Sequence, residues 1–265
     1  MIVIIKDKLQ FFYHSGSGNT FLVVQKMVEV FKKNGVEVNL YKIEDTNPEK
    51  IDSKIPTGIA FPVAFQATHP FIWDFIKNMP DANGTTIFMV DTMMAYSGAI
   101  VGPTKRILDK KGYKCIGAKE IIMPNDFLPK NVNKDKNKKK VEKGILEAKK
   151  YAIDILEGKT KWKRIPLLSD FFNFLVSNKF VMNNINLSMG KRINVDLNKC
   201  VNCGLCANLC PVNNIKMNNR TPIFGNDCEL CTRCLNFCPS NAIKISNKSF
   251  KQYKAVNPDK LMKGE

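Results

Sequence analysis

The sequence predicts an open α/β domain with a doubly wound, five-stranded parallel sheet, followed by a small α+β domain rich in cysteine. Two observations support this division. Strand-like apolar runs alternate with helical patterns through the first 158 residues, and eight of the nine cysteines fall between Cys200 and Cys238. The 265 residues are 44% hydrophobic and 25% charged, which is typical of globular proteins and excludes a disordered or fibrous chain.

The elements of the first domain are predicted from the spacing of apolar residues. Strands are expected at residues 9–14, 36–41, 58–63, 86–91 and 116–123. A helix is expected after the Gly/Ser turn at 15–20, because Val24, Met27, Val28 and Phe31 share one helical face. Further helices are expected near 70–78 and 98–111 and in a stretch from Val141 to about Leu156. Strands that alternate with helices form a parallel sheet covered on both faces, with ligands at the carboxyl ends of the strands.

Four segments are predicted along the chain. They are a first domain at 1–158, a helical connector at 159–192, a cysteine-rich domain at 193–246 and a tail at 247–265. The aromatic stretch 166–181 is predicted to be a helix packed on a domain face. The basic residues before it leave an alternative, in which residues 159–181 contact a membrane surface, but aromatic stripes usually bury against protein.

The cysteines are interpreted through the compartment that the sequence indicates. The N-terminal region lacks the long apolar core of a secretory signal, and no run approaches the roughly 18 apolar residues that span a membrane. We therefore expect a cytoplasmic protein, in which thiols stay reduced and clustered cysteines bind metal. Cys115 stands apart from the cluster and is expected to be a small buried residue.

The cysteine-rich domain contains an internal repeat, because Cys228 follows Cys200, and Ile243 follows Ile215, after 28 positions. Each half has the pattern C-x-x-C-x-x-C-x-x-x-C-P, which is the spacing of domains that hold two iron–sulfur clusters. The x-x spacing places three thiolates around one cubane, while the fourth cysteine reaches the other cluster. We therefore assign Cys200, Cys203, Cys206 and Cys238 to one [4Fe-4S] cluster, and Cys228, Cys231, Cys234 and Cys210 to the second.

Zinc is the main alternative for these cysteines, since it also binds four thiolates. Zinc sites usually pair two short C-x-x-C hooks across a long gap, whereas here two identical runs end in Cys-Pro. Residues 193–246 resemble the bacterial two-cluster ferredoxins.

A Gly/Ser loop follows the first predicted strand and precedes the first predicted helix. It consists of Ser15, Gly16, Ser17, Gly18, Asn19 and Thr20. Backbone amides at a helix N-terminus favour an anion, and three phosphate sites compete. A Walker loop needs a lysine where Asn19 stands, and a dinucleotide fingerprint needs a glycine where Phe21 stands, whereas the phosphate of FMN can be held by neutral donors alone. A phosphate loop for another ligand, or a turn without a ligand, is the remaining interpretation.

The loop SGSGNT resembles the phosphate loop of flavodoxins, and the resemblance extends over about residues 8–158. It implies FMN and the strand order 2-1-3-4-5. It also implies that two further strand-end loops contact the flavin ring. The candidate contacts there are Phe65, Gln66, Thr92, Met93 and Tyr96. Apart from Asp91, these loops carry no carboxylate, and the two histidines, His14 and His69, lie beside them with structural roles expected.

Together the two parts resemble the flavodoxin–ferredoxin fusion proteins of anaerobes. The resemblance implies an electron-transfer protein, with FMN and two [4Fe-4S] clusters, that relays low-potential electrons to redox partner proteins. An FMN-dependent reductase of a small molecule, fed by its own ferredoxin domain, is the alternative, although no catalytic constellation stands out. The net charge of +17 predicts acidic partners. No nucleic-acid motif accompanies the charge, and the sequence leaves a homodimer open.

Overall fold

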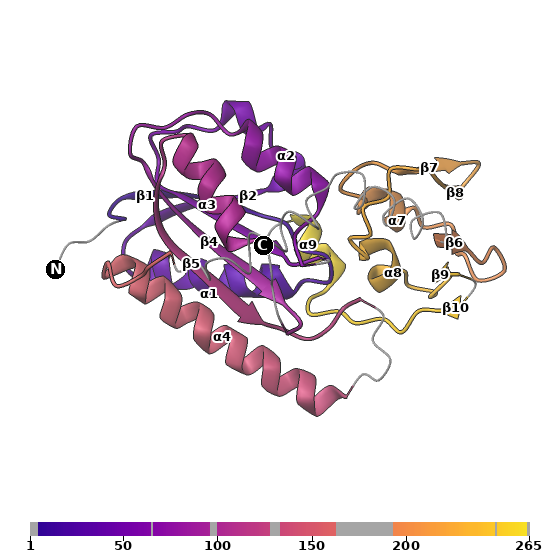
Figure 1. The fold of residues 1–265 in the computed structure, drawn as a ribbon. Helices are drawn as coiled ribbons and strands as arrows, with labels where there is room; N and C mark the ends of the chain where they lie inside the picture. Colours follow the sequence, from indigo (N-terminus) through magenta and orange to yellow (C-terminus); the bar gives the residue numbers. More distant parts are fainter. Residues whose placement is uncertain are drawn as a thin grey trace.

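The computed structural model describes residues 5–64, 66–95, 100–127, 133–162, 193–246 and 248–263. Its first part is a three-layer α/β domain with helices on both faces of a central sheet (Figure 1). The strands are β1 (Lys8–Tyr13), β2 (Glu37–Lys42), β3 (Thr57–Pro62), β4 (Thr86–Met93) and β5 (Lys114–Ile122). The helices are α1 (Asn19–Lys33), α2 (Pro70–Asn78), α3 (Val101–Lys110) and α4 (Lys134–Leu156), with short 3-10 helices η1 (Ile43–Asp45) and η2 (Pro48–Lys50).

The five strands are all parallel and lie in the order β2-β1-β3-β4-β5. This is the flavodoxin-like order of a doubly wound sheet, so the predicted fold class is confirmed. Each strand begins and ends within two residues of its predicted position. The order reverses at β1 and β3, and the crevice at the carboxyl ends of these strands is where such sheets bind ligands.

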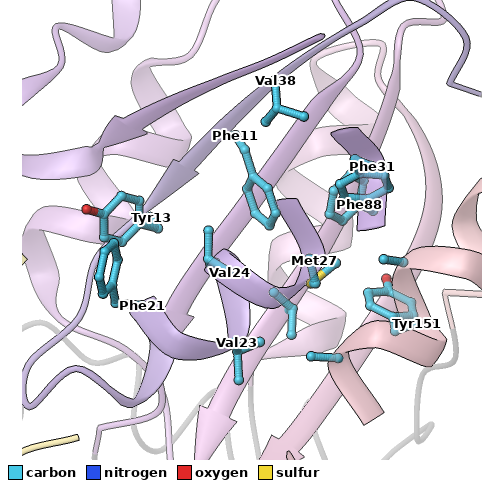
Figure 2. Packing of buried hydrophobic residues seen from close by; sticks show 14 of the residues in the cluster. Phe11, Tyr13, Phe21, Val23, Val24, Met27, Phe31, Val38, Phe88 and Tyr151 are labelled. Carbon is cyan, nitrogen blue, oxygen red and sulfur yellow. The ribbon is translucent and has the colours of Figure 1, made fainter. Parts of the chain in front are cut away.

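Two apolar cores hold the three layers together. α1 and α4 pack side by side on one face of the sheet, and α2 and α3 cover the other. Met27 and Phe31 of α1 are fully buried, as their helical spacing predicts. Figure 2 shows Phe31 beside Phe88 of β4, with ring centroids 5.9 Å apart. Tyr151 of α4 donates a hydrogen bond to the carbonyl of Met89 at 3.1 Å, which fixes that helix to the sheet.

The second part is smaller and lies at the carboxyl ends of the parallel strands (Figure 1). Its elements are β6 (Ile193–Val195), α7 (Leu205–Asn208), β7 (Ile215–Asn218), β8 (Thr221–Phe224), α8 (Arg233–Phe237), β9 (Ile243–Ile245), β10 (Lys248–Ser249) and α9 (Pro258–Lys263). β10, β9 and β6 form one antiparallel sheet, and β7 and β8 form a hairpin. The core of this part is short of apolar residues and includes four of the cysteines at its edge.

The chain after the cysteine-rich region returns to the first domain. The hydroxyl of Tyr253 donates to Asn19 Oδ1 at 3.0 Å, and the backbone N–H of Ala255 donates to the carbonyl of Ser17 at 2.9 Å. Leu261 of α9 is buried in the core beneath α1. The C-terminal tail is thus part of the first domain's packing.

Some predicted features fall elsewhere. The predicted helix at 166–181, and most of the connector that contains it, lie outside the described residues. Within the described ranges, no helix combines the length and the apolar character needed to cross a membrane. Cys115 packs against the second core, and burial raises the pKa of its thiol to about 12, so it behaves as the inert packing residue that was expected.

Candidate functional site

A cavity of about 310 Å³ lies at the carboxyl ends of the parallel strands, within the size range of small-molecule sites. Four strand-end loops line the cavity. The Gly/Ser loop after β1 contributes Gly16 and Asn19, and the end of β3 and the loop after it contribute Pro62, Val63, Ala64, Gln66 and His69. The end of β4 and the loop after it contribute Thr92, Met93, Met94 and Ala95, and the loop after β5 contributes residues 123–127. The remaining wall consists of Leu230, Cys231 and Thr232. The cavity therefore lies between the sheet domain and the cysteine-rich domain.

The Gly/Ser loop is folded around the hydroxyl of its first residue. Ser15 Oγ accepts hydrogen bonds from the backbone N–H groups of Gly18 at 3.2 Å and Phe21 at 3.3 Å. Gly18 has a φ of +100°, a conformation that glycine adopts without steric cost. The loop leads directly into α1, a helix of 15 residues whose N-terminal amides and dipole favour an anion. The loop is therefore suited to a phosphate group.

The structure brings together five of the eleven predicted flavin contacts. The five that line the cavity are Gly16, Asn19, Gln66, Thr92 and Met93. Ser15, Ser17, Gly18 and Thr20 belong to the loop but do not line the cavity. Phe65 and Tyr96 lie outside the described residues. The lining combines hydrogen-bond donors at the loop with apolar walls elsewhere, and this combination fits the phosphate and the ring of FMN.

A carboxylate from a fourth loop reaches the Gly/Ser loop. Asp126, after β5, accepts a hydrogen bond from Ser17 Oγ at 2.6 Å and lines the cavity. Burial raises the pKa of Asp126, and hydrogen bonds from the hydroxyl and N–H of Ser17 oppose that shift. The three loops considered in the sequence do lack carboxylates apart from Asp91. Sequence reasoning missed Asp126 because 109 residues separate it from its partner Ser17.

The eight clustered cysteines surround two small cavities. One is lined by Cys200, Cys203, Cys206 and Cys238, and the other by Cys210, Cys228, Cys231 and Cys234. These are the two sets that the spacing assigns, with the fourth cysteine of each run crossing to the other half. Among the described residues, no group of three or more His, Cys, Asp or Glu side chains is gathered tightly enough to hold a single metal ion. Four thiols spread around a cavity fit a cubane cluster instead.

The backbone follows the internal repeat closely. Three pairs of residues related by 28 positions have positive φ angles: Asn202 and Leu230 (58° and 58°), Gly204 and Thr232 (71° and 62°), and Asn213 and Asn241 (51° and 50°). Thr232 is β-branched, so this conformation is unfavourable there, whereas the first half has glycine at the equivalent position. The repeat thus includes the turns that aim the cysteines, as well as the cysteines themselves.

Backbone amides also point at the sulfur atoms in a repeated way. The N–H of Asn214 donates to Cys210 Sγ at 3.2 Å, and the N–H of Ala242 donates to Cys238 Sγ at 3.2 Å. Hydrogen bonds to ligating sulfurs stabilise their negative charge and are one means of setting the reduction potential of a cluster. In each cavity, the cysteine that comes from the other half of the repeat therefore accepts the same backbone hydrogen bond.

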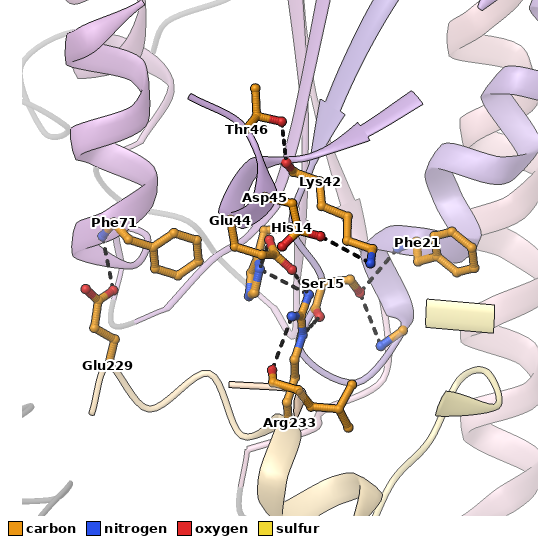
Figure 3. A network of polar contacts seen from close by, with 12 residues as sticks. His14, Ser15, Phe21, Lys42, Glu44, Asp45, Thr46, Phe71, Glu229 and Arg233 are labelled. Carbon is orange, nitrogen blue, oxygen red and sulfur yellow. Dashed lines mark hydrogen bonds and ion pairs between the residues drawn. The ribbon is translucent and has the colours of Figure 1, made fainter. Parts of the chain in front are cut away.

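Arg233, at the start of α8, makes the main polar contact between the two domains (Figure 3). Its guanidinium forms an ion pair with Glu44, and the side chains are only 5% and 4% exposed. Arg233 Nε donates to the carbonyl of Ser15 at 2.8 Å, and Nη1 donates to the carbonyl of Leu209 at 3.3 Å. The Gly/Ser loop and the second cysteine run are therefore joined through one buried side chain.

His14 completes this network from the end of β1. Its Nδ1 lies 2.9 Å from Glu44 Oε2 and 3.3 Å from Arg233 Nη2. Burial lowers the pKa of His14, and the nearby charge of Arg233 lowers it further, whereas the charge of Glu44 opposes the shift. The imidazole is therefore neutral, and its Nδ1–H donates to Glu44. Burial alone would raise the pKa of Glu44, but His14 and Arg233 lower it more, so the carboxylate stays ionised.

A second buried contact joins the domains beside the first. His69 Nδ1 donates to the carbonyl of Glu229 at 2.9 Å, and the backbone N–H of Phe71 donates to the Glu229 carboxylate at 3.1 Å. Burial lowers the pKa of His69 to about 3, so this imidazole is also neutral. Both histidines serve the interface, and His69 contributes to the cavity wall as well.

Sequence reasoning did not identify Glu229 or Arg233, although the repeat contains a signal for both. The first half has Val201 and Leu205 at the equivalent positions, so the second half replaces two apolar residues by charged ones. Where one half of the repeat has a charged residue and the other half has an apolar one, the charged residue indicates a contact that only its own half makes. In the structure, that contact is the first domain.

Comparisons with known proteins address each part separately. Residues 193–216 match the family described as "4Fe-4S binding domain". No curated protein matches the chain. Among solved structures, a flavodoxin from the domain Archaea is 15% identical and covers 57% of this chain and 96% of its own, with a TM-score of 0.43. Flavodoxin 2 from Bacillus cereus is 18% identical and covers 57% of this chain and 98% of its own, also with a TM-score of 0.43.

Rubredoxin oxygen:oxidoreductase from the anaerobe Desulfovibrio gigas is 14% identical and covers 55% of this chain and 37% of its own, with a TM-score of 0.36. The matched family shows iron–sulfur binding for the first cysteine run. The flavodoxin-like fold of the first domain is shown by its own strand order.

Proposed function

We propose that this protein transfers electrons between FMN and two [4Fe-4S] clusters, and onward to redox partner proteins. The observation that carries the proposal is that the strand-end cavity and the second cysteine cavity share part of their lining. Leu230, Cys231 and Thr232 line both the strand-end cavity and the second cysteine cavity. A flavin in one cavity and a cluster in the other would then contact the same three residues.

Each group of residues has its own task in this proposal. The Gly/Ser loop holds the phosphate of FMN, and the loops after β3 and β4 enclose the ring. The two crossed sets of four cysteines hold the clusters, and Arg233 keeps the second set against the first domain. FMN exchanges one or two electrons and each cluster exchanges one, so the three groups together can convert between the two kinds of transfer.

The test is an anaerobic ultraviolet–visible spectrum with iron, sulfide and flavin counted on the same sample. The proposal requires about eight irons, about eight sulfides and one FMN per chain. Eight irons without flavin would remove FMN from the proposal, and four irons would remove one cluster. Steady turnover of NADH or NADPH by the loaded protein would favour the reductase alternative.

The partner is proposed to be an acidic redox protein that contacts the first cysteine run. Cys203 is exposed, and two apolar side chains near it, Leu197 and Val201, are 63% and 61% exposed. Lys199, which lies between them in sequence, is also exposed. Because Val201 is the repeat equivalent of Glu229, this surface corresponds to the one that the second run buries against the first domain.

Charge reversal tests this surface. Lys199→Glu is expected to slow electron transfer to an acidic partner several-fold at low salt, and the effect is expected to fade at high salt because ions screen the attraction. Lys143→Glu is the matched control, since this lysine of α4 is 77% exposed and belongs to the other domain. Equal effects of both variants would assign the attraction to the overall charge rather than to this surface.

A further inference from the structure

Asp126 places a negative group at the loop that is suited to phosphate. Ser17 Oγ donates to Asp126 Oδ2 at 2.6 Å, and the N–H of Ser17 also stabilises this carboxylate. The same oxygen would lie 3.7 Å from a Cβ placed on Gly16. The hydroxyl and the N–H of Ser17 are therefore both directed at a carboxyl group of the protein itself.

Among the residues that the structure describes, no basic side chain is found to act on the Asp126 carboxyl group. In this part of the chain, the groups that act on Asp126 are Ser17 and its own backbone. Arg233 binds the same loop through the carbonyl of Ser15, and its charge is paired with the carboxylate of Glu44. A phosphate that entered the loop would meet the Asp126 carboxyl group, which already occupies the Ser17 hydroxyl.

We propose that Asp126 is an internal anion that competes with a ligand's phosphate for the Gly/Ser loop. Two negative groups a few ångströms apart repel each other strongly in a partly buried site, and the Ser17 hydroxyl can donate to only one of them. A bound phosphate must therefore displace the Asp126 carboxylate. Asp126 thereby sets how strongly the site prefers a phosphorylated flavin over an unphosphorylated one. The choice of flavin as the ligand rests on the proposed function, whereas the competition itself does not.

The test compares FMN with riboflavin, which has the same ring and no phosphate. Dissociation constants are measured by quenching of flavin fluorescence on the cluster-loaded protein and on Asp126→Asn, whose amide oxygen still accepts from Ser17. We expect Asp126→Asn to bind FMN at least about tenfold more tightly, with riboflavin binding unchanged. Asp7→Asn is the control, because it removes an exposed carboxylate at the opposite end of β1. An unchanged ratio of FMN to riboflavin affinity in Asp126→Asn would overturn the proposal.

A second measurement separates this inference from the proposed function. Inorganic phosphate is titrated into the same proteins, and the rise in Tm is recorded. Phosphate is expected to stabilise Asp126→Asn more than either the parent protein or Asp7→Asn. Equal stabilisation of all three would overturn the role of Asp126, even if FMN binds. If neither flavin binds while phosphate does distinguish the variants, the proposed flavin is refuted and the competing anion is supported.

Discussion

Replacement of Arg233 by methionine is expected to loosen the contact between the two domains. The variant keeps much of the side-chain volume but removes the partner of Glu44, whose carboxylate is buried with only 4% of its side chain exposed. His14 also contacts Glu44, but its imidazole is neutral in the parent protein, where burial lowers its pKa. Removal of one partner from a buried ion pair typically costs about 3–5 kcal/mol, because the other charge is left desolvated and unpaired.

The loss can be measured as local opening in the native state. Hydrogen exchange of residues 14–20 reports undocking, because Arg233 Nε holds the carbonyl of Ser15. Since each 1.4 kcal/mol is a factor of ten, a cost of about 3 kcal/mol predicts exchange that is more than about a hundredfold faster in Arg233→Met. Residues 86–93 in the centre of the sheet provide the internal control and should exchange at the parent rate.

A double variant tests whether the unpaired charge of Glu44 causes the opening. Arg233→Met combined with Glu44→Gln removes both charges, so no unpaired carboxylate remains, and exchange of residues 14–20 should return most of the way to the parent rate. Exchange in the single variant within about threefold of the parent rate would show that the ion pair does not hold the domains together. A double variant that opens as readily as the single one would show that the buried charge is not the cause.

Asp91, the second cysteine cavity and Gly18 each provide a further test. Asp91 is buried with no hydrogen-bond partner among the described residues, and burial holds its pKa well above the usual value, so the folded state retains a proton that the unfolded state loses. Stability from this group is therefore lost as pH rises from about 4 through the folded pKa, and Asp91→Asn should raise Tm more at pH 8 than at pH 5; equal shifts would contradict this. Cys210→Ser and Cys228→Ser should leave the same residual electron paramagnetic resonance spectrum, since both line one cavity, whereas different residual spectra would refute the crossed pairing. Gly18→Ala should lower stability by about 1–2 kcal/mol in thermal unfolding, because φ is +100° and the new Cβ would lie 2.5 Å from Val256 Cγ2; Val256→Ala should restore only the steric part.

The elements of the first domain could be predicted because their signals are local. Met27 and Phe31 repeat at helical spacing, and each strand is a short apolar run bounded by turns, so position and type follow from neighbouring residues. The Gly/Ser loop was found for the same reason. The crossed cysteine sets depend on longer spacing, but the repeat of 28 residues carried that information as well.

The contacts between the domains could not be predicted in this way. Arg233 and Glu44 are far apart in sequence, and nothing distinguishes either from the other charged residues, 65 in all, until the fold brings them together. Asp126 follows a strand without any motif, and its role arises only because its loop passes over the start of α1. Charges that pair across a domain interface leave no periodic pattern, so a single sequence shows them only where a repeat is broken, as at Glu229 and Arg233.

The return of the tail to the Gly/Ser loop has a consequence for biosynthesis. Tyr253 is made 234 residues after its partner Asn19, which at about 5–20 residues per second is a delay of roughly 10–50 s. In the later part of that interval, once α4 has been made as far as Leu156, the nascent sheet domain can fold while its loop still lacks the tail. A ligand that is present during translation therefore meets an uncovered loop, whereas one added after release meets a loop that the tail contacts.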